Sequence, residues 1–201
     1  MNMLLMLVLG LVSTGERQYA EPDTGAYFHE TLRHGELEYH LTGADVRRVA
    51  GSKVYALAHY TADLSAVESS ISPASRLARW ISDERPKCIV IKGLRDVPAR
   101  GIRYSWNQGL ERVGYRGSNY KFFVNAFSLD FSRNSELCLF APDAGTLIAL
   151  QDGREIGRWN DADLVRAVWT ISIGERAELS NRLNLASRSH LKLVPGARRD
   201  G

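Results

Sequence analysis

Cysteine is scarce in this chain of 201 residues, which contains only two. Two cysteines exclude a disulfide scaffold and a four-cysteine zinc site. The chain also lacks a large excess of one charge, because it contains 26 Lys and Arg and 23 Asp and Glu, for a net charge of +3. Since basic and acidic residues are interleaved, we expect no nucleic-acid partner. No apolar run reaches the ~20 residues that span a bilayer, so we expect no stable membrane span in the mature chain.

What the chain does contain is typical of a globular protein. Apolar residues make up 44% and charged residues 24% of the sequence, which excludes a disordered or collagen-like chain. The length fits one ordinary domain or two small ones. A chain of this size buries about 70% of its unfolded surface, so it can hold a core without disulfides or metals.

The N-terminus has the features of a secretory signal. Residues 3–12 (MLLMLVLGLV) form an uncharged apolar run, and cleavage is plausible near Gly15 or Ala20. No Lys or Arg precedes the run, unlike the usual signal. We expect a periplasmic or secreted protein; in the alternative, a cytoplasmic protein, the run is a buried strand or helix. The predicted plan is a signal at 1–20, an N-terminal arm at 21–34, a domain at 35–187 and a flexible tail at 188–201.

Apolar periodicity predicts the elements of the domain. Residues 52–61 alternate, with Val54, Ala56, Ala58 and Tyr60 on one face and Tyr55, Leu57 and His59 on the other, which indicates a central strand. Further strands are predicted at 36–42, ending in a turn at Gly43, and at 87–92, 136–140, 146–150 and 154–159; helices are predicted at 69–82, 99–113, 119–127, 161–173 and 178–186. Asp152-Gly153 predicts a hairpin. This order favours an α+β fold, an antiparallel sheet with helices on one face.

Four segments, in order, resemble the chalcone isomerase-like family. Leu41 to Arg47, followed by Lys53-Val54-Tyr55-Ala56, is similar to that family's strand, glycine turn with arginine, and next strand. Gly93 to Val97, residues 134–159 and Ile171 to Gly174 are similar to its later junctions. The resemblance covers residues 35–187. It implies an open-faced β-sandwich, in which a large antiparallel sheet and a helical layer enclose an apolar cleft.

The same resemblance implies roles for individual residues. Arg47 takes the position of an arginine that steers an intramolecular addition to an enone in the plant isomerases and holds a carboxylate in the related fatty-acid-binding proteins. A guanidinium suits both tasks, because it binds carboxylates bidentately and stabilises developing negative charge. Tyr55 is a candidate donor to the same ligand, or a core tyrosine. Tyr104 is the candidate for a tyrosine that orders a catalytic water. Arg95 takes the position of a lysine and is a further candidate ligand contact.

Three departures from the family pattern argue against isomerase activity. Glu111 replaces an asparagine, Ile171 replaces a Ser or Thr, and Asp45 replaces a small residue. One cation and apolar walls suit a binder. We therefore expect a non-catalytic binder of a small anionic amphiphile, such as a fatty acid or an aromatic acid. The alternatives are an isomerase (intramolecular lyase) that uses Arg47 and Tyr104, and a cell-envelope interaction module.

Other chemistry-bearing residues are few. His59 shares the face of Tyr55, so it is a candidate ligand contact as well as a core residue. His29, His34 and His40 match no defined metal motif, and we expect no metal and no cofactor. Cys88 and Cys138 lie mid-strand; they are either buried free thiols or, if the strands are adjacent, a disulfide. The sequence leaves the oligomeric state open.

Overall fold

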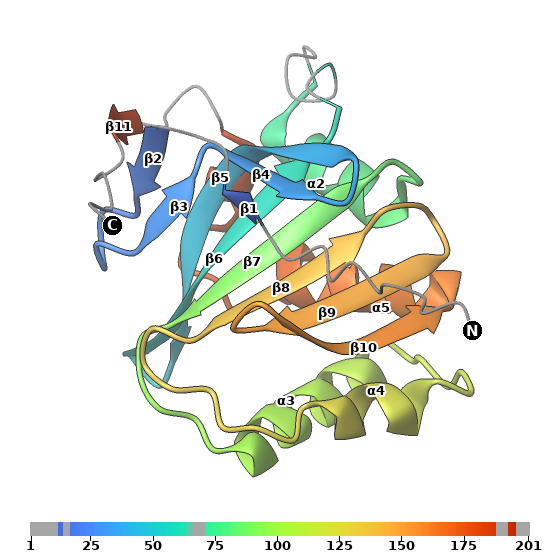
Figure 1. The fold of residues 1–201 in the computed structure, drawn as a ribbon. Coiled ribbons are helices and arrows are strands. Elements are labelled where there is room, and N and C mark those ends of the chain that lie inside the picture. Colours follow the sequence, from blue (N-terminus) through green and yellow to red (C-terminus); the bar gives the residue numbers. More distant parts are fainter. Residues whose placement is uncertain (1–11, 14–16, 64, 66–70, 188–192, 196–201) are drawn as a thin grey trace, which may run out of the picture.

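An eight-stranded antiparallel sheet forms the centre of the molecule. The computed structural model describes residues 12–13, 17–63, 65, 71–187 and 193–195. The strand order is β1-β4-β5-β6-β7-β8-β9-β10 (Figure 1). These strands are β1 (Val12–Ser13), β4 (Thr31–His34), β5 (Leu37–Val49), β6 (Ser52–Thr61), β7 (Lys87–Gly93), β8 (Glu136–Ala141), β9 (Thr146–Gln151) and β10 (Arg154–Asn160). A small sheet of order β11-β2-β3 comprises β2 (Arg17–Ala20), β3 (Tyr27–His29) and β11 (Leu193–Pro195).

The helices lie against one face of the large sheet. They are α2 (Pro73–Ser82), α3 (Ala99–Arg112), α4 (Tyr120–Ala126), α5 (Ala162–Ile173) and the 3-10 helix η1 (Arg182–Ala186). Their apolar faces bury a core that contains Leu57, Ile89 and Leu139 from the strands, with Trp106 and Trp169 from the helices. This arrangement confirms the predicted α+β architecture of an antiparallel sheet covered by a helical layer.

The opposite face of the sheet holds a second core, because the sheet curls. His34 on β4 stacks on Phe140 of β8, with ring centroids 4.3 Å apart, although three strands separate β4 from β8 in the sheet order. Tyr39 also contacts Phe140, at 5.4 Å between centroids. Strong curling brings the hairpin of β4 and β5 over the middle strands, and the apolar side chains of this second core are buried.

The central strand β6 has the predicted faces. Ala56, Ala58 and Tyr60 belong to the core inside the curled sheet, whereas Leu57 belongs to the core under the helices, against which Tyr55 packs. Alternation along a strand sends successive side chains to opposite faces, so one strand serves both cores. The predicted central position is confirmed, because β6 lies between β5 and β7.

The hairpin of β9 and β10 and the start of α5 follow from local chemistry. Asp152 and Gly153 have φ of 51° and 78°, the left-handed pair that a tight two-residue hairpin needs. Asp161 caps α5, because its side chain accepts a hydrogen bond from Leu164 N–H at 2.9 Å. The hairpin and the start of a helix at residue 161 were predicted from the sequence.

The predicted turn at Gly43 is wrong. Gly43 lies inside β5, which continues to Val49, at a shift in register against β6. A Cβ on Gly43 would stand 2.0 Å from the carbonyl oxygen of Asn184. The glycine therefore allows η1 to cross β5 closely, and Arg47 stands on a strand and not in a turn.

The predicted helix at 178–186 is also wrong over its first half. Only Arg182–Ala186 is helical, as the 3-10 helix η1. The preceding segment, residues 178–180, is extended beside β5: Arg48 N–H donates to Glu178 O at 3.3 Å, and Ser180 N–H to Val46 O at 2.9 Å. Here β5 extends beyond its pairing with β4, and the open edge offers hydrogen bonds that outweigh helical propensity.

The N-terminal part of the chain falls only partly within the described residues. Most of the predicted signal lies outside them, whereas Arg17–Ala20 forms β2, paired with β3 and β11. The arm contains the strands β3 and β4. None of the helices in the described ranges combines the length and apolarity that crossing a bilayer requires. Cys88 and Cys138 are buried free thiols, and burial raises the pKa of both.

Candidate functional site

Arg47 and Tyr55 meet on neighbouring strands. They are direct partners in the register of β5 and β6, and Arg47 Nη1 donates a hydrogen bond of 3.3 Å to the Tyr55 hydroxyl oxygen. The guanidinium carbon lies 5.7 Å from the centre of the Tyr55 ring. The hairpin of β5 and β6 therefore assembles the two residues that the sequence singled out, on the side of the sheet that carries the helices.

The guanidinium of Arg47 already forms an ion pair with a carboxylate of the same chain. Glu178 Oε2 lies 2.7 Å from Arg47 Nη2, and Glu178 Oε1 lies 3.9 Å from Arg112 Nη1 on α3. Burial lowers the pKa of Arg47, but Tyr55 and Glu178 outweigh that effect, so the pKa rises and the residue stays charged. The extended segment 178–180 positions this carboxylate beside Arg47, a contact that no sequence pattern predicted.

A small apolar cavity adjoins Tyr55 beneath α3. Its volume is about 80 Å³, well below the ~300 Å³ at which sites for small organic ligands begin. The polar side chains in its wall are Tyr55, Ser105 and Gln151. The cavity is lined by Val54, Tyr55, Ile91, Val97, Ile102, Ser105, Trp106, Phe127, Phe131, Leu137 and Gln151. Tyr55 thus touches both the cavity and the cation.

A larger groove lies beside Arg112, the second arginine that approaches Glu178. It has a volume of about 450 Å³ and lies between α2, α3 and α5. We call it the α3 groove; it is lined by Ala78, Ile81, Arg112, Val113, Thr170, Ile171, Gly174, Glu175 and Arg176. Arg112, which approaches Glu178, forms part of its wall. The ion pairs of Glu178 therefore connect Arg47, beside the cavity, to the groove.

One helix contact separates the cavity from the groove. A Cβ on Gly109 of α3 would stand 3.0 Å from Ile171 Cγ2 on α5, so the two helices touch at this point. Trp106, one turn before Gly109, lines the cavity, and Val113, one turn after it, lines the groove. Ile171 thus fills the space between the helices at the position where the family resemblance implied a polar residue.

The other predicted site residues lie elsewhere. Tyr104 is 67% exposed and lies outside the cavity wall formed by its neighbours Ile102 and Trp106. Arg95 is exposed in the loop between β7 and α3. The structure therefore brings Arg47 and Tyr55 together and leaves Tyr104 and Arg95 at the surface.

His59 belongs to the core. It is fully buried, its ring stacks on Trp80 at 4.4 Å between centroids, and its Nδ1 lies 2.9 Å from Thr42 Oγ1. Burial, with the charge of Lys87, lowers the pKa of His59 to about 3. The imidazole is neutral at physiological pH, shares a strand face with Tyr55 as predicted, and lines neither the cavity nor the groove.

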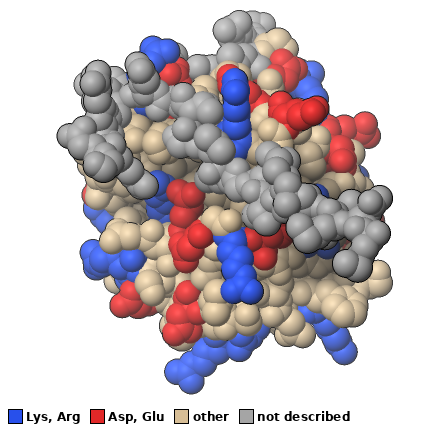
Figure 2. All heavy atoms as spheres, in the orientation of Figure 1, with Lys and Arg blue, Asp and Glu red and all other residues tan. Residues whose placement is uncertain are grey.

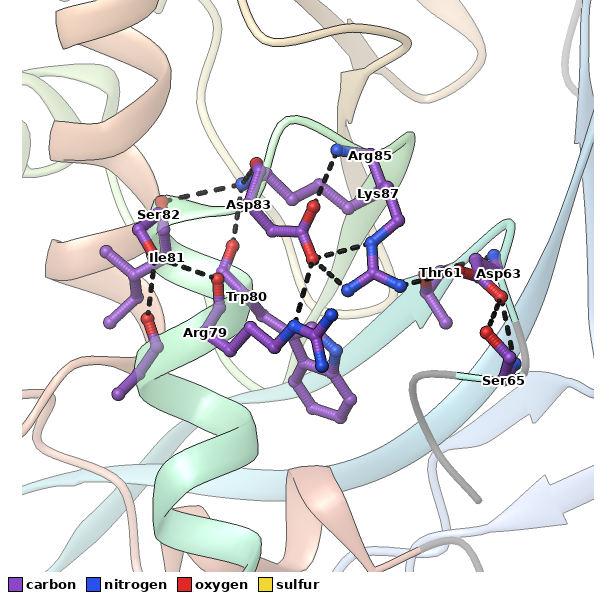
Figure 3. Close-up of polar contacts among 11 residues, drawn as sticks. Thr61, Asp63, Ser65, Arg79, Trp80, Ile81, Ser82, Asp83, Arg85 and Lys87 are labelled. Carbon is purple, nitrogen blue, oxygen red and sulfur yellow. Dashed lines mark hydrogen bonds and ion pairs between the residues drawn. The ribbon is translucent and has the colours of Figure 1, made fainter. Parts of the chain in front are cut away.

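A buried lysine lies near His59, and no sequence pattern had indicated it. Lys87 is 3% exposed, and its Nζ donates to the carbonyl oxygens of Trp80 at 2.6 Å and Asp83 at 2.7 Å, where α2 ends (Figure 3). Burial lowers its pKa to about 8, and Asp83 opposes the shift. Arg85 pairs with Asp63 and Asp83 beside it. These contacts close the end of a helix and form no cleft, so Lys87 is structural.

Comparisons with known proteins agree with this architecture. No protein-family model and no curated protein matches the chain. Among solved structures, a fatty-acid-binding protein of Arabidopsis thaliana superposes with a TM-score of 0.67 and 20% identity, over 86% of this chain and 98% of that one. At this identity the likeness shows the fold. The chain therefore adopts the chalcone isomerase-like α+β fold that the sequence resemblance implied.

Proposed function

We propose that the protein is a non-catalytic binder of a small anionic amphiphile, with Arg47 as the anion clamp. The observation that carries the proposal is the carboxylate of Glu178, 2.7 Å from Arg47 Nη2. A guanidinium that holds one carboxylate has the geometry to hold another. Tyr55 would donate its hydroxyl to the same group. The fatty-acid-binding protein of the same fold supports this ligand class.

The ligand tail would lie along the inner face of α3. The cavity of about 80 Å³ is too small for a fatty acid, whereas the α3 groove of about 450 Å³ matches the size of a ligand site. Binding therefore requires Glu178 to leave Arg47, so that the ligand head replaces it. It also requires the contact of Gly109 with Ile171 to widen, so that cavity and groove join. The first change involves the half-exposed Glu178, whereas the second separates two buried residues of the helical layer; neither requires a change in the strand order of the sheet.

The arrangement favours binding over isomerisation. Tyr104, the candidate for positioning a catalytic water, is exposed and outside the cavity wall. His59, the histidine on the face of Tyr55, is neutral, stacked on Trp80 and sealed in the core. Arg47 and Tyr55 alone supply a cation and a hydrogen-bond donor, which suffice to hold an anion.

Calorimetric titration with dodecanoate, below its micelle concentration, tests the proposal. We expect Arg47→Gln to weaken binding at least about tenfold, since a hydrogen-bonded charge contributes about 1.5–3 kcal/mol. Arg158→Gln is the matched control, because Arg158 is also a strand arginine in an ion pair, with Glu155 at 2.9 Å. Equal affinity of wild type and Arg47→Gln, or equal binding of dodecanol and dodecanoate, would overturn the anion clamp. Turnover of a chalcone by the wild type would favour the isomerase.

A further inference from the structure

The positive charge of the chain is concentrated around α3 and α4. Residues 95–133, which hold both helices and their flanking loops, contain seven Lys and Arg and three Asp and Glu, for a net charge of +4. The whole chain carries +3, so all other residues together carry −1. We call this segment the basic helical pair. Figure 2 shows Lys and Arg side chains projecting from the lower edge of the molecule, where α3 and α4 lie in Figure 1.

Most of these cations have no acidic partner within the described part of the chain. Arg112 approaches Glu178, whereas Arg95, Arg100, Arg103, Arg116, Lys121 and Arg133 form no ion pair with a described residue. The local acids bind neutral groups instead. Asp130 accepts the N–H of Ala99, and Asp96 accepts that of Arg133. The cations are therefore available to an anionic partner.

Large apolar side chains stand among these cations. Tyr104 is 67%, Phe122 72% and Leu129 50% exposed, and they are three of the six exposed large hydrophobic residues among the described positions. They belong to one structural unit. Arg103 on α3 donates to the carbonyl oxygen of Phe127, directly after α4, and Asp130 binds the first residue of α3. The three exposed side chains therefore belong to one packed unit: Tyr104 on α3, Phe122 on α4 and Leu129 in the loop that follows α4.

We propose that the basic helical pair docks on the surface of an anionic lipid bilayer. Lys and Arg near such a surface each contribute about 1 kcal/mol through lipid phosphates, and exposed aromatic and aliphatic side chains enter the headgroup region. Proteins bind single-stranded nucleic acids through phosphate contacts and base stacking, and the aliphatic side chain of Leu129 makes neither contact. The observations therefore favour a lipid surface over a nucleic acid.

The position of the cavity supports this partner. Ile102 and Trp106 line the cavity from α3, while Arg100 and Tyr104 of the same helix are exposed. A helix is about 10 Å thick, so docking would place the cavity one helix away from the lipid. If the protein binds an acyl ligand as proposed above, that ligand could pass between bilayer and cavity without crossing much water. The docking surface itself rests on the charge and exposure of the basic helical pair.

Vesicle flotation with the full chain tests the docking surface. The vesicles are either pure phosphatidylcholine or phosphatidylcholine with 30 mol% phosphatidylglycerol. We expect binding to the anionic vesicles and release at high salt. The double variant Arg100→Gln and Lys121→Gln should bind about twenty-five-fold more weakly, since each charge contributes about fivefold. Phe122→Ser should also reduce binding. The matched controls are Arg182→Gln, in η1, and Tyr27→Ser, on β3 and 53% exposed, which should bind like the wild type.

Every variant carries the apolar run of residues 3–12, so differences between variants report on the basic helical pair. Equal binding to neutral and anionic vesicles, or equal binding by patch and control variants, would overturn the proposal. So would retention on a duplex or single-stranded oligonucleotide, through Arg100 and Lys121, without binding to vesicles. Dodecanoate titration separates this proposal from the proposed function. The patch variants should bind dodecanoate normally, and Arg47→Gln should still bind vesicles.

Discussion

Glu178 holds Arg47 through a contact of 2.7 Å between Oε2 and Nη2, across 131 positions of the chain. The contact exists because the segment after α5 runs along the open edge of β5. Leu179 forms a bridge with Arg47 itself, and Ser180 binds Val46 through both its N–H and its hydroxyl. In the proposed binder, this carboxylate occupies the position that the ligand head would take.

Removing the charge of Glu178 should therefore strengthen ligand binding. We expect Glu178→Gln to raise the affinity for dodecanoate up to about fivefold, because a half-exposed ion pair contributes at most about 1 kcal/mol. For the same reason the free energy of unfolding should fall by less than ~1 kcal/mol. Titration calorimetry and urea unfolding measure the two effects. Glu155→Gln is the control, since Glu155 also pairs with an arginine, Arg158 at 2.9 Å, at a similar exposure, and lines neither the cavity nor the groove. An unchanged or lower affinity for Glu178→Gln would contradict competition.

Gly43→Ala should destabilise the fold. The added methyl group would stand 2.0 Å from the carbonyl oxygen of Asn184, so η1 has to move away from β5. Overpacking of this kind typically costs about 1–3 kcal/mol. Gly145→Ala is the control, because its Cβ would meet only Asp143 Oδ1 at 3.7 Å. Urea unfolding of the three proteins makes the comparison. Equal midpoints for wild type and Gly43→Ala would show that η1 is not packed as closely as described.

The buried Lys87 should make stability rise with pH in the alkaline range. Its pKa is lowered from 10.5 to about 8 in the folded protein, mainly by burial. Between these values the unfolded chain binds the proton and the folded chain does not, so raising the pH favours folding. From pH 8 to 10.5 we expect the wild type to gain about 3 kcal/mol relative to Lys87→Met. If the free energy of unfolding changed with pH in the same way in both proteins, the lowered pKa of Lys87 would be refuted.

The buried His59 should make stability fall with falling pH in the acid range. Its pKa is lowered from 6.5 to about 3 by burial and by Lys87. Between these values the unfolded chain binds a proton that the folded chain excludes, so stability falls as pH falls below 6.5. The contribution is about 1.4 kcal/mol per pH unit. His59→Asn keeps a partner for Thr42 and should show a shallower decline between pH 6.5 and 4. The same slope in both proteins would mean that other groups cause the acid sensitivity.

Local patterns in the sequence predicted most elements of the fold correctly. The alternation along residues 52–61 identified β6 and the separate faces of Tyr55 and Ala56, because side-chain direction in a strand depends only on position. Asp152-Gly153 specified a hairpin, and Asp161 specified the start of α5, since turn and cap chemistry act within a few residues. The resemblance singled out Arg47 and Tyr55 as contacts of one ligand, and the register of β5 and β6 makes them direct neighbours.

Contacts between distant segments decided the rest. Gly43 suits a turn, yet it lies in a strand because η1, about 140 residues later, needs the space beside it. Residues 178–180 follow a helical pattern, yet they are extended because β5 offers an unpaired edge. Local propensity is weak, and hydrogen bonds to a partner strand override it. The sequence by itself thus determined the elements, their faces and the candidate cation Arg47. Only the tertiary structure placed a carboxylate on that cation, closed the cavity beside it and exposed a basic, aromatic surface on the helix above it.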